Sequence, residues 1–158
     1  MKRHFLSFVV IALLSTSACS RPRSPVAATS AAPSDLARED LDKLQGTWRI
    51  ESSVWNGVPE RDVALRVTLI FQGDKLIWVD KDGIQYQEDT IKLMPDQSPK
   101  AIDNWSKGRS HAAPGIYSWE GDTFKWCSAG GDNKVRPTLF ASKPGSKQSL
   151  MLLRRHKK

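Results

Sequence analysis

Residues 65–83 read LRVTLIFQGDKLIWVDKDG, in which apolar side chains alternate with others on both sides of Gly73-Asp74. Successive side chains of a β-strand point to opposite faces, so a period of two is typical of strands with one buried face. We expect one strand over 65–72 and a second over 76–80. Gly73-Asp74 fits a tight turn between them, and Asp82-Gly83 is a further hairpin signal. The stretch therefore predicts antiparallel neighbours.

The same pattern extends through most of the remaining chain. Short apolar segments recur between Gly, Pro, Asn and Asp residues, and none of the connections resembles the crossover helix that parallel strands require. In the segment that begins at Trp48, we expect Trp48, Ile50, Ser52 and Val54 to share one face. The expected strands are 48–54, 65–72, 76–80, 84–93, 101–105, 115–119, 123–127, 138–141 and 149–154.

Many short antiparallel strands indicate an all-β fold. A long antiparallel sheet must protect its edges, and closure into a barrel removes them most completely. We therefore predict an up-and-down barrel of about eight strands, with an open sandwich as the alternative. A short helix should precede it over 34–45, because Ser34 can cap its start and Gly46 can end it. Its apolar side would carry Leu36, Ala37, Leu41 and Leu44.

The first residues have the three-part layout of a secretory signal peptide. Lys2 and Arg3 precede an apolar run over 5–14, and small residues follow up to Ala18. The apolar run is shorter than the roughly 20 residues that a permanent membrane span needs. Thr16-Ser17-Ala18-Cys19 resembles a bacterial lipobox, which implies lipidation of Cys19 and its exposure as the mature N-terminus. A plain signal peptide cut nearby, with Cys19 incidental, is the alternative.

Three segments follow from this layout. Residues 1–18 form the signal peptide, and residues 19–34 form the lipidated cysteine and a linker rich in small residues and proline. Residues 35–158 form the barrel domain. We expect the protein to be exported and held at the bacterial cell envelope, in the periplasm or at the outer membrane, with the membrane as a partner through its lipid.

The formal charge of +7 raises the question of nucleic-acid binding. Four basic residues precede Asp35, and four more lie in the last five positions; the body between keeps 16 basic against 17 acidic residues. A nucleic-acid-binding domain needs a basic face within its folded body. The distribution therefore argues against a nucleic-acid partner.

The chain lacks the usual local motifs of catalysis and metal binding. His111, His156 and Cys127 share no chelating spacing, and Asp80-Lys81-Asp82-Gly83 fits a hairpin turn better than a calcium loop. No Gly-x-Ser-x-Gly or phosphate-cradling motif is present. We expect no enzyme, no cofactor and no metal. Cys127 fits a buried, inert thiol.

The six tryptophans allow two interpretations. They could line a pocket for an apolar ligand, or they could fill the core, since an indole buries up to about 250 Å². A small eight-stranded barrel is wide enough for either arrangement. The candidate wall residues are Phe71, Trp78, Tyr117, Trp119 and Trp126.

The start of the barrel region resembles the opening motif of lipocalins. Lys43-Leu44-Gln45-Gly46-Thr47-Trp48 places a short helix before Gly-x-Trp on the first strand. In lipocalins this tryptophan closes one end of the barrel beneath a basic residue of the last strand. The resemblance implies that Trp48 and Arg154, or its neighbour Arg155, form a structural closure, and we assign Arg154 to it.

A closer resemblance covers residues 39–155. It rests on an ordered series of motifs: Asp42-x-Leu44-Gln45-Gly46-Thr47-Trp48, Phe71-x-Gly73-Asp74-Lys75, Pro99-Lys100-Ala101-Ile102-Asp103, Gly115-Ile116-Tyr117, Gly121-Asp122-Thr123-Phe124-Lys125-Trp126-Cys127, Arg136-Pro137-Thr138-x-Phe140 and Ala141-Ser142-Lys143-Pro144-Gly145-Ser146. The chain looks like a member of an uncharacterised, planctomycete-enriched family of exported lipocalin-like domains. That resemblance implies a fold but no activity. Trp105 departs from the family, which more often carries a smaller or different apolar residue there.

These observations favour a non-catalytic, monomeric binding protein with a small hydrophobic ligand inside the barrel. The alternative is a solid barrel whose loops bind an envelope protein or a polysaccharide, as an inhibitor or assembly factor would. The candidate loops are 56–62, 107–113 and 130–136.

Overall fold

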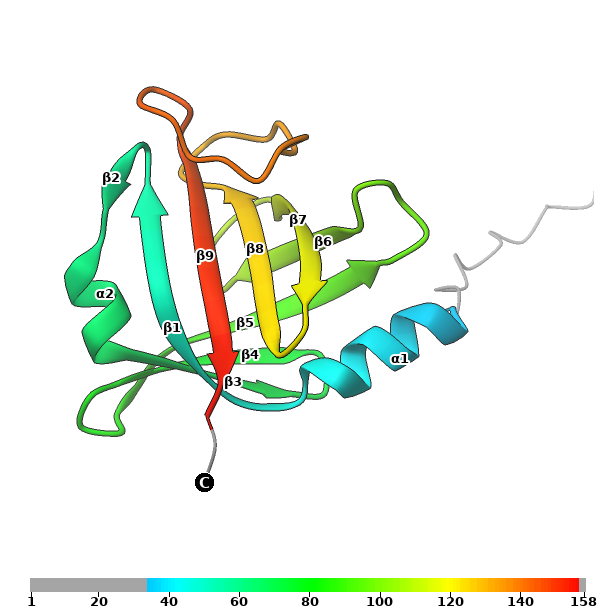
Figure 1. Cartoon of the computed structure of the whole chain (residues 1–158), viewed down its shortest axis with the longest axis horizontal. Coiled ribbons are helices and arrows are strands. Elements are labelled where there is room, and N and C mark those ends of the chain that lie inside the picture. Colours follow the sequence, from blue (N-terminus) through cyan, green and yellow to red (C-terminus); the bar gives the residue numbers. More distant parts are fainter. Residues whose placement is uncertain (1–33, 157–158) are drawn as a thin grey trace, which may run out of the picture. The chain divides into compact units, whose positions relative to one another are not determined.

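Antiparallel strands that pair in chain order and close on themselves form the body of the protein (Figure 1). A computed structural model describes residues 34–156. The barrel strands are β1 Gly46–Trp55, β3 Val67–Gln72, β4 Lys75–Asp80, β5 Gln85–Met94, β6 Ala101–Ser106, β7 Ala113–Glu120, β8 Thr123–Ala129 and β9 Gln148–Arg155. Pairing of β1 with β9 closes the eight-stranded barrel, so the predicted all-β barrel is confirmed and the open sandwich is wrong. The remaining elements are α1 Asp35–Leu44, β2 Val58–Pro59 and α2 Arg61–Arg66.

A bulge in β1 changes the predicted alternation. The register with β9 shifts between Ile50 and Ser52, which leaves Glu51 as the extra residue. Trp48 and Ile50 are buried as expected, but beyond the bulge Ser53 is buried instead of Ser52 and Val54. The expectation for the second half of this strand was therefore wrong, because one inserted residue exchanges the two faces.

The predicted N-terminal helix is confirmed as α1. Ser34 caps it by accepting a hydrogen bond from the backbone N–H of Ala37 at 3.2 Å. Its buried side carries Ala37, Asp40 and Leu44, and Leu36 is exposed, contrary to expectation. The spacing of three and four residues puts Asp40, and not Leu36, on the stripe that faces the barrel.

Two other predicted strand segments differ from the structure. Leu65 lies in the short helix α2, where its side chain is 81% exposed, and strand β3 begins only at Val67. Residues 138–141 form no strand. Arg136 instead anchors the preceding segment, because its guanidinium donates to the carbonyls of Ile102 and Gly115 and pairs with Asp103 at 2.7 Å.

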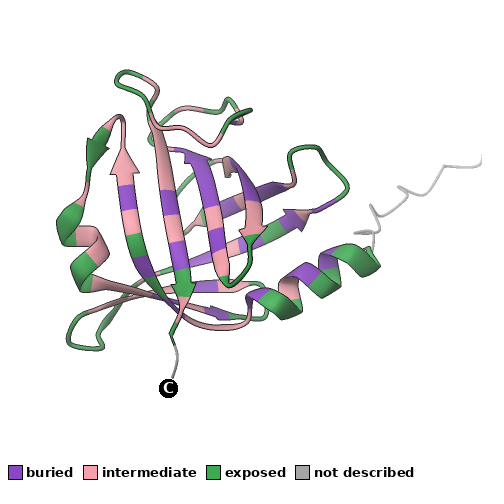
Figure 2. Ribbon diagram, viewed as in Figure 1, coloured by how far each residue is buried: buried purple, intermediate pink, exposed green. Residues whose placement is uncertain are grey.

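The core fills the inside of the barrel. Figure 2 shows buried and more exposed positions alternating along the strands, as a sheet closed around one interior requires. The buried cluster extends from Leu44 of α1 through Trp48 to Leu153 of β9. Val63 and Ala64 of α2 pack against it. Within residues 34–156, neither helix combines the length and the apolar character needed to cross a membrane.

The boundaries predicted at residues 18 and 19, together with Cys19 and the linker up to residue 33, lie outside the described residues. Their assignment as a signal peptide, lipid attachment site and linker stays a prediction.

Candidate functional site

Three of the five candidate wall residues surround one phenylalanine. The ring centroid of Phe124 lies 6.3 Å from that of Phe71, 5.5 Å from that of Tyr117 and 4.8 Å from that of Trp119. Phe71 and Tyr117 are fully buried in this cluster, and Trp119 is half-buried against it. The structure thus brings these side chains together by packing them on one another.

Trp78 and Trp126 belong to the same interior. Trp126 is buried, and Trp78 packs against the cluster while its Nε1–H donates to the Asp89 carboxylate at 2.9 Å. Asp89 also accepts from Gln87 and Asn104, so neutral donors satisfy this buried carboxylate. None of the five candidate side chains lines any of three surface hollows, of about 1030, 340 and 310 Å³.

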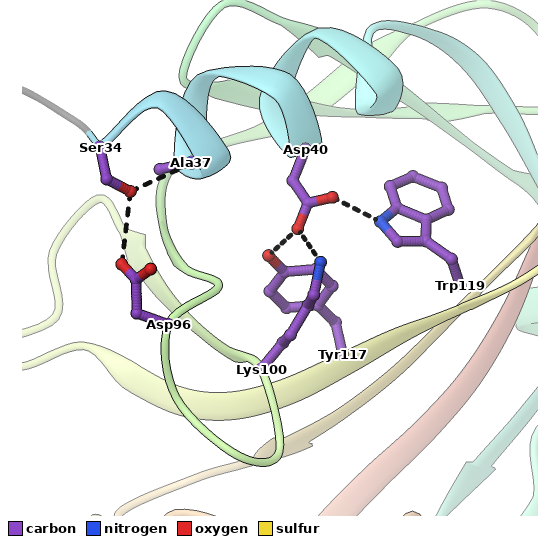
Figure 3. A network of polar contacts seen from close by, with 7 residues as sticks. All are labelled: Ser34, Ala37, Asp40, Asp96, Lys100, Tyr117 and Trp119. Carbon is purple, nitrogen blue, oxygen red and sulfur yellow. Dashed lines mark hydrogen bonds and ion pairs between the residues drawn. The ribbon is translucent and has the colours of Figure 1, made fainter.

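Asp40 of α1 binds the polar atoms of two of these aromatic residues (Figure 3). Its carboxylate accepts hydrogen bonds from Tyr117 Oη at 2.6 Å, from Lys100 Nζ at 2.7 Å and from Trp119 Nε1 at 3.1 Å. Burial alone would raise the pKa of Asp40, but these donors and the charge of Lys100 bring that pKa below its ordinary value. Burial and the adjoining Asp40 raise the pKa of Tyr117.

This network fastens α1 against one end of the barrel. Ser34 adds a contact at the start of the helix, where its hydroxyl donates to Asp96 at 3.3 Å. The hydroxyl of Tyr117 and the indole N–H of Trp119 are therefore already hydrogen-bonded to Asp40 within the protein. Asp40 is a functional residue that we did not predict from the sequence; its place on the apolar side of the helix, three residues after Ala37, was the available signal.

Trp48 is covered by Arg155 and not by Arg154, so the assignment of Arg154 was wrong. The Arg155 guanidinium carbon lies 4.5 Å from the Trp48 ring centroid, and Arg154 forms an ion pair with Glu51 at 2.6 Å. The reason is register: Trp48 pairs with Arg155, and successive residues of a strand point to opposite faces. The Trp48 indole donates to the carbonyl of Leu44 at 2.7 Å.

A large hollow lies on the outside of the barrel, across β4, β5, β6 and the loop after β6. Its volume is about 1030 Å³. We call it the outer groove. It is lined by Lys75, Gln85, Tyr86, Gln87, Glu88, Thr90, Trp105, Ser106, Lys107, Gly108 and Arg109.

The register of three strands explains part of this lining. Thr90 pairs with Lys75 on one side and with Trp105 on the other, so the three residues form a row across the sheet. Their side chains face outward because Asp89 and Asn104, the neighbours of Thr90 and Trp105, are buried. Lys75 Nζ donates to Thr90 Oγ1 at 2.8 Å. The row puts an ammonium group and an indole ring on one face of the sheet.

The outer groove has two exposed aromatic side chains. Trp105 is 39% exposed and Tyr86 is 54% exposed. Tyr86 lies at a bulge of β5, where Gln85 and Gln87 pair with consecutive residues of β4 and Tyr86 has no partner. Burial and the carboxylates of Asp80 and Asp89 raise the pKa of Tyr86, so its hydroxyl stays protonated and can donate.

The charges of the outer groove are mostly positive. Lys75, Lys107 and Arg109 line it with Glu88 as the one carboxylate among its described lining residues. A smaller hollow of about 310 Å³ adjoins it and shares Gly108 and Arg109. The smaller hollow also includes Ser110, His111, Gly131 and Asp132.

Two of the three candidate loops therefore meet at this site. Arg109 donates to the carbonyl of Gly131 at 3.2 Å, which joins loop 107–113 to loop 130–136. Loop 56–62 does not line either hollow. Its Asn56 accepts from the backbone N–H of Lys147, and its Gly57 N–H donates to Ser142.

In the smaller hollow, the Ser110 hydroxyl and His111 Nδ1 lie 3.2 Å apart, on neighbouring residues of one loop. Across residues 34–156, no three His, Cys, Asp or Glu side chains gather closely enough to hold a metal ion. Cys127 is buried and its thiol donates to the carbonyl of Ala141 at 3.5 Å. Burial raises the pKa of this thiol and keeps it in its less reactive form.

The chain matches no family model, no curated protein and no solved structure. Its resemblance to exported lipocalin-like domains stays a prediction from the motifs of its sequence.

Proposed function

We propose that this protein is a non-catalytic binding protein, lipid-anchored at the cell envelope, whose outer groove holds a segment of an acidic polysaccharide. One observation carries the proposal: two exposed aromatic side chains and three cationic ones line a single groove formed by the outer face of the sheet and the loop after β6. The proposal develops the alternative in which loops, and not the barrel interior, make the contact.

The aromatic side chains favour a sugar ligand. A sugar ring has C–H groups on its faces and hydroxyl groups around its edge, so it packs on an aromatic face while hydrogen-bonding to neighbouring polar groups. In the outer groove, Trp105 and Tyr86 offer the faces. Gln85, Ser106 and Thr90 offer amide and hydroxyl partners beside them.

The charges favour an acidic ligand over a neutral one. Lys75, Lys107 and Arg109 outnumber Glu88, so a carboxylated or sulfated sugar gains from the local field. The guanidinium of Arg109 already gives one N–H to Gly131. Its remaining donors can contact an anion in a forked geometry.

The alternatives have weaker support. Phe71, Tyr117 and Trp126 are buried in one cluster with the rest of the core, which favours a filled interior over a ligand cavity. A protein partner usually needs about 800 Å² of contact around an apolar centre. The polar lining and concave form of the outer groove fit a narrow polymer better.

Calorimetric titration with a galacturonic acid hexamer tests this proposal, with a neutral glucose hexamer as the comparison. We expect the acidic sugar to bind more tightly, and we expect Trp105→Ala to weaken its binding about tenfold or more. The control is Leu139→Ala, which truncates another exposed apolar side chain outside the groove and should bind as the wild type does.

Lys107→Gln with Arg109→Gln tests the charges. This double variant should weaken binding of the acidic hexamer and reduce its dependence on salt, because screening acts on exposed charges. Equal binding of the two hexamers, or wild-type affinity in Trp105→Ala, would contradict the proposal.

A further inference from the structure

A basic pocket lies on the opposite pair of strands, where β1 and β9 close the barrel. Arg49, Arg154, Arg155 and His156 line a hollow of about 340 Å³. It shares no residue with the outer groove. An inference about this pocket therefore does not depend on the proposed function.

Two arginines of this pocket are direct cross-strand partners. Arg49 of β1 pairs with Arg154 of β9 on the outward face of the closing strands. Like charges directly opposite each other on a sheet destabilise it. An anion between the two guanidinium groups would relieve that repulsion.

The protein supplies one carboxylate against these charges. Glu51 forms an ion pair with Arg154 at 2.6 Å and a longer one with Arg49 at 3.9 Å, and it is the carboxylate that pairs with either of them among the described residues. Arg155 is occupied differently, since it donates to the carbonyls of Lys43 and Gln45 and covers Trp48. The pocket therefore keeps an excess of positive charge.

Arg49 retains donors that can contact a ligand. Its side chain is 60% exposed, and that of Arg154 is 45% exposed. Guanidinium groups bind phosphoryl oxygens through paired, charge-assisted hydrogen bonds. His156 also lines the pocket.

We propose that the Arg49–Arg154 pocket binds a phosphoryl group. The same chemistry occurs in free phosphate and in the headgroup of an anionic phospholipid. The experiment uses a shortened chain of residues 20–158. This range contains every described strand and the whole described core, and the shortened chain lacks Cys19, so no lipid can hold it on a membrane.

The first arm is an NMR titration with inorganic phosphate, at an ionic strength held constant with chloride. The second arm is sedimentation with vesicles of phosphatidylglycerol and phosphatidylcholine, compared with phosphatidylcholine alone. The pocket variant is Arg49→Gln with Arg154→Gln. The control is Lys92→Gln with Lys143→Gln, which removes the same charge from exposed positions outside the pocket.

Saturable phosphate binding that weakens about tenfold in the pocket variant, and less than about twofold in the control, supports a site for free phosphate. Vesicle binding with the same pattern, without phosphate binding, supports a lipid headgroup site. Absence of both in the wild type, or equal losses in the two variants, overturns the proposal. If the double variant fails to unfold cooperatively, Arg49→Gln alone replaces it, because its ion pair with Glu51 is long.

Discussion

Replacement of Asp40 by alanine should detach α1 from the end of the barrel. The change leaves the Tyr117 hydroxyl and the Trp119 indole N–H without the acceptor that they have at 2.6 and 3.1 Å. Hydrogen bonds to a charged group contribute about 1.5–3 kcal/mol each. The Lys100 side chain is 41% exposed, so solvent screening keeps its ion pair below about 1 kcal/mol. We expect the free energy of unfolding to fall by about 3 kcal/mol.

Urea denaturation followed by tryptophan fluorescence measures this change. The matched control is Glu39→Ala on the exposed side of the same helix, which should stay within about 0.5 kcal/mol of the wild type. The hydrogen bonds lower the pKa of Asp40 in the folded state. The contribution of Asp40 to the free energy of unfolding is therefore fully present above pH 3.8, the ordinary pKa, and is lost as the pH falls through the lowered pKa. Asp40→Asn should therefore show a smaller loss of stability on acidification. Equal stability of Asp40→Ala and Glu39→Ala would refute the role of this network.

Three other outcomes are expected. Because the pKa of Tyr117 is raised in the folded protein, the contribution of Tyr117 to the free energy of unfolding is present below pH 10.0, its ordinary pKa, and is lost at higher pH. Tyr117→Phe should therefore reduce the loss of stability that urea denaturation measures at alkaline pH. An unchanged loss would show that other groups cause it. Arg155→Gln should lower the free energy of unfolding by about 1–2 kcal/mol and Arg154→Gln by less than about 1 kcal/mol, measured by urea denaturation, because only Arg155 covers Trp48; the reverse order would contradict the closure. Mass spectrometry of the protein from its own host should find a lipid on Cys19 at the N-terminus, and an unmodified start beyond Cys19 would exclude the anchor.

The sequence predicted the barrel because alternation and turn residues are local signals. Each strand between β3 and β9 is bounded by its own hairpin turn or loop, and the barrel follows once neighbours pair in order. Register is less local. The bulge at Glu51 depends on how β9 pairs with β1. The residues of neither strand predict it from their own sequence.

The dependence on contacts between distant segments also explains why the predictions for particular side chains were wrong. Arg154 and Arg155 are equivalent in sequence, and only their pairing with β1 shows which one faces Trp48. Leu65 continues the apolar alternation of β3, but the short helix α2 includes it because Val63 and Ala64 pack on the core. Residues 138–141 have a strand-like composition, yet the bonds of Arg136 to β6 and β7 hold the preceding segment as a loop.

Part of the candidate site could be predicted from the sequence. The sequence indicated loops 107–113 and 130–136, and it indicated Trp105 as a departure from the motifs of the lipocalin-like domains that it resembles. It could not show that Lys75, Thr90 and Trp105 form one row, since these residues belong to three strands. The outer groove arises from that register together with the contact between Arg109 and Gly131.

The six tryptophans allow a direct test of where a ligand binds. Each indole N–H gives its own NMR signal, and Trp105 lies in the outer groove while Trp78 and Trp126 lie in or against the core. On titration with the galacturonic acid hexamer, we expect the Trp105 signal to shift saturably while the Trp78 and Trp126 signals stay in place. Shifts of Trp78 and Trp126 without a shift of Trp105 would put the ligand inside the barrel and contradict the outer groove as the binding site.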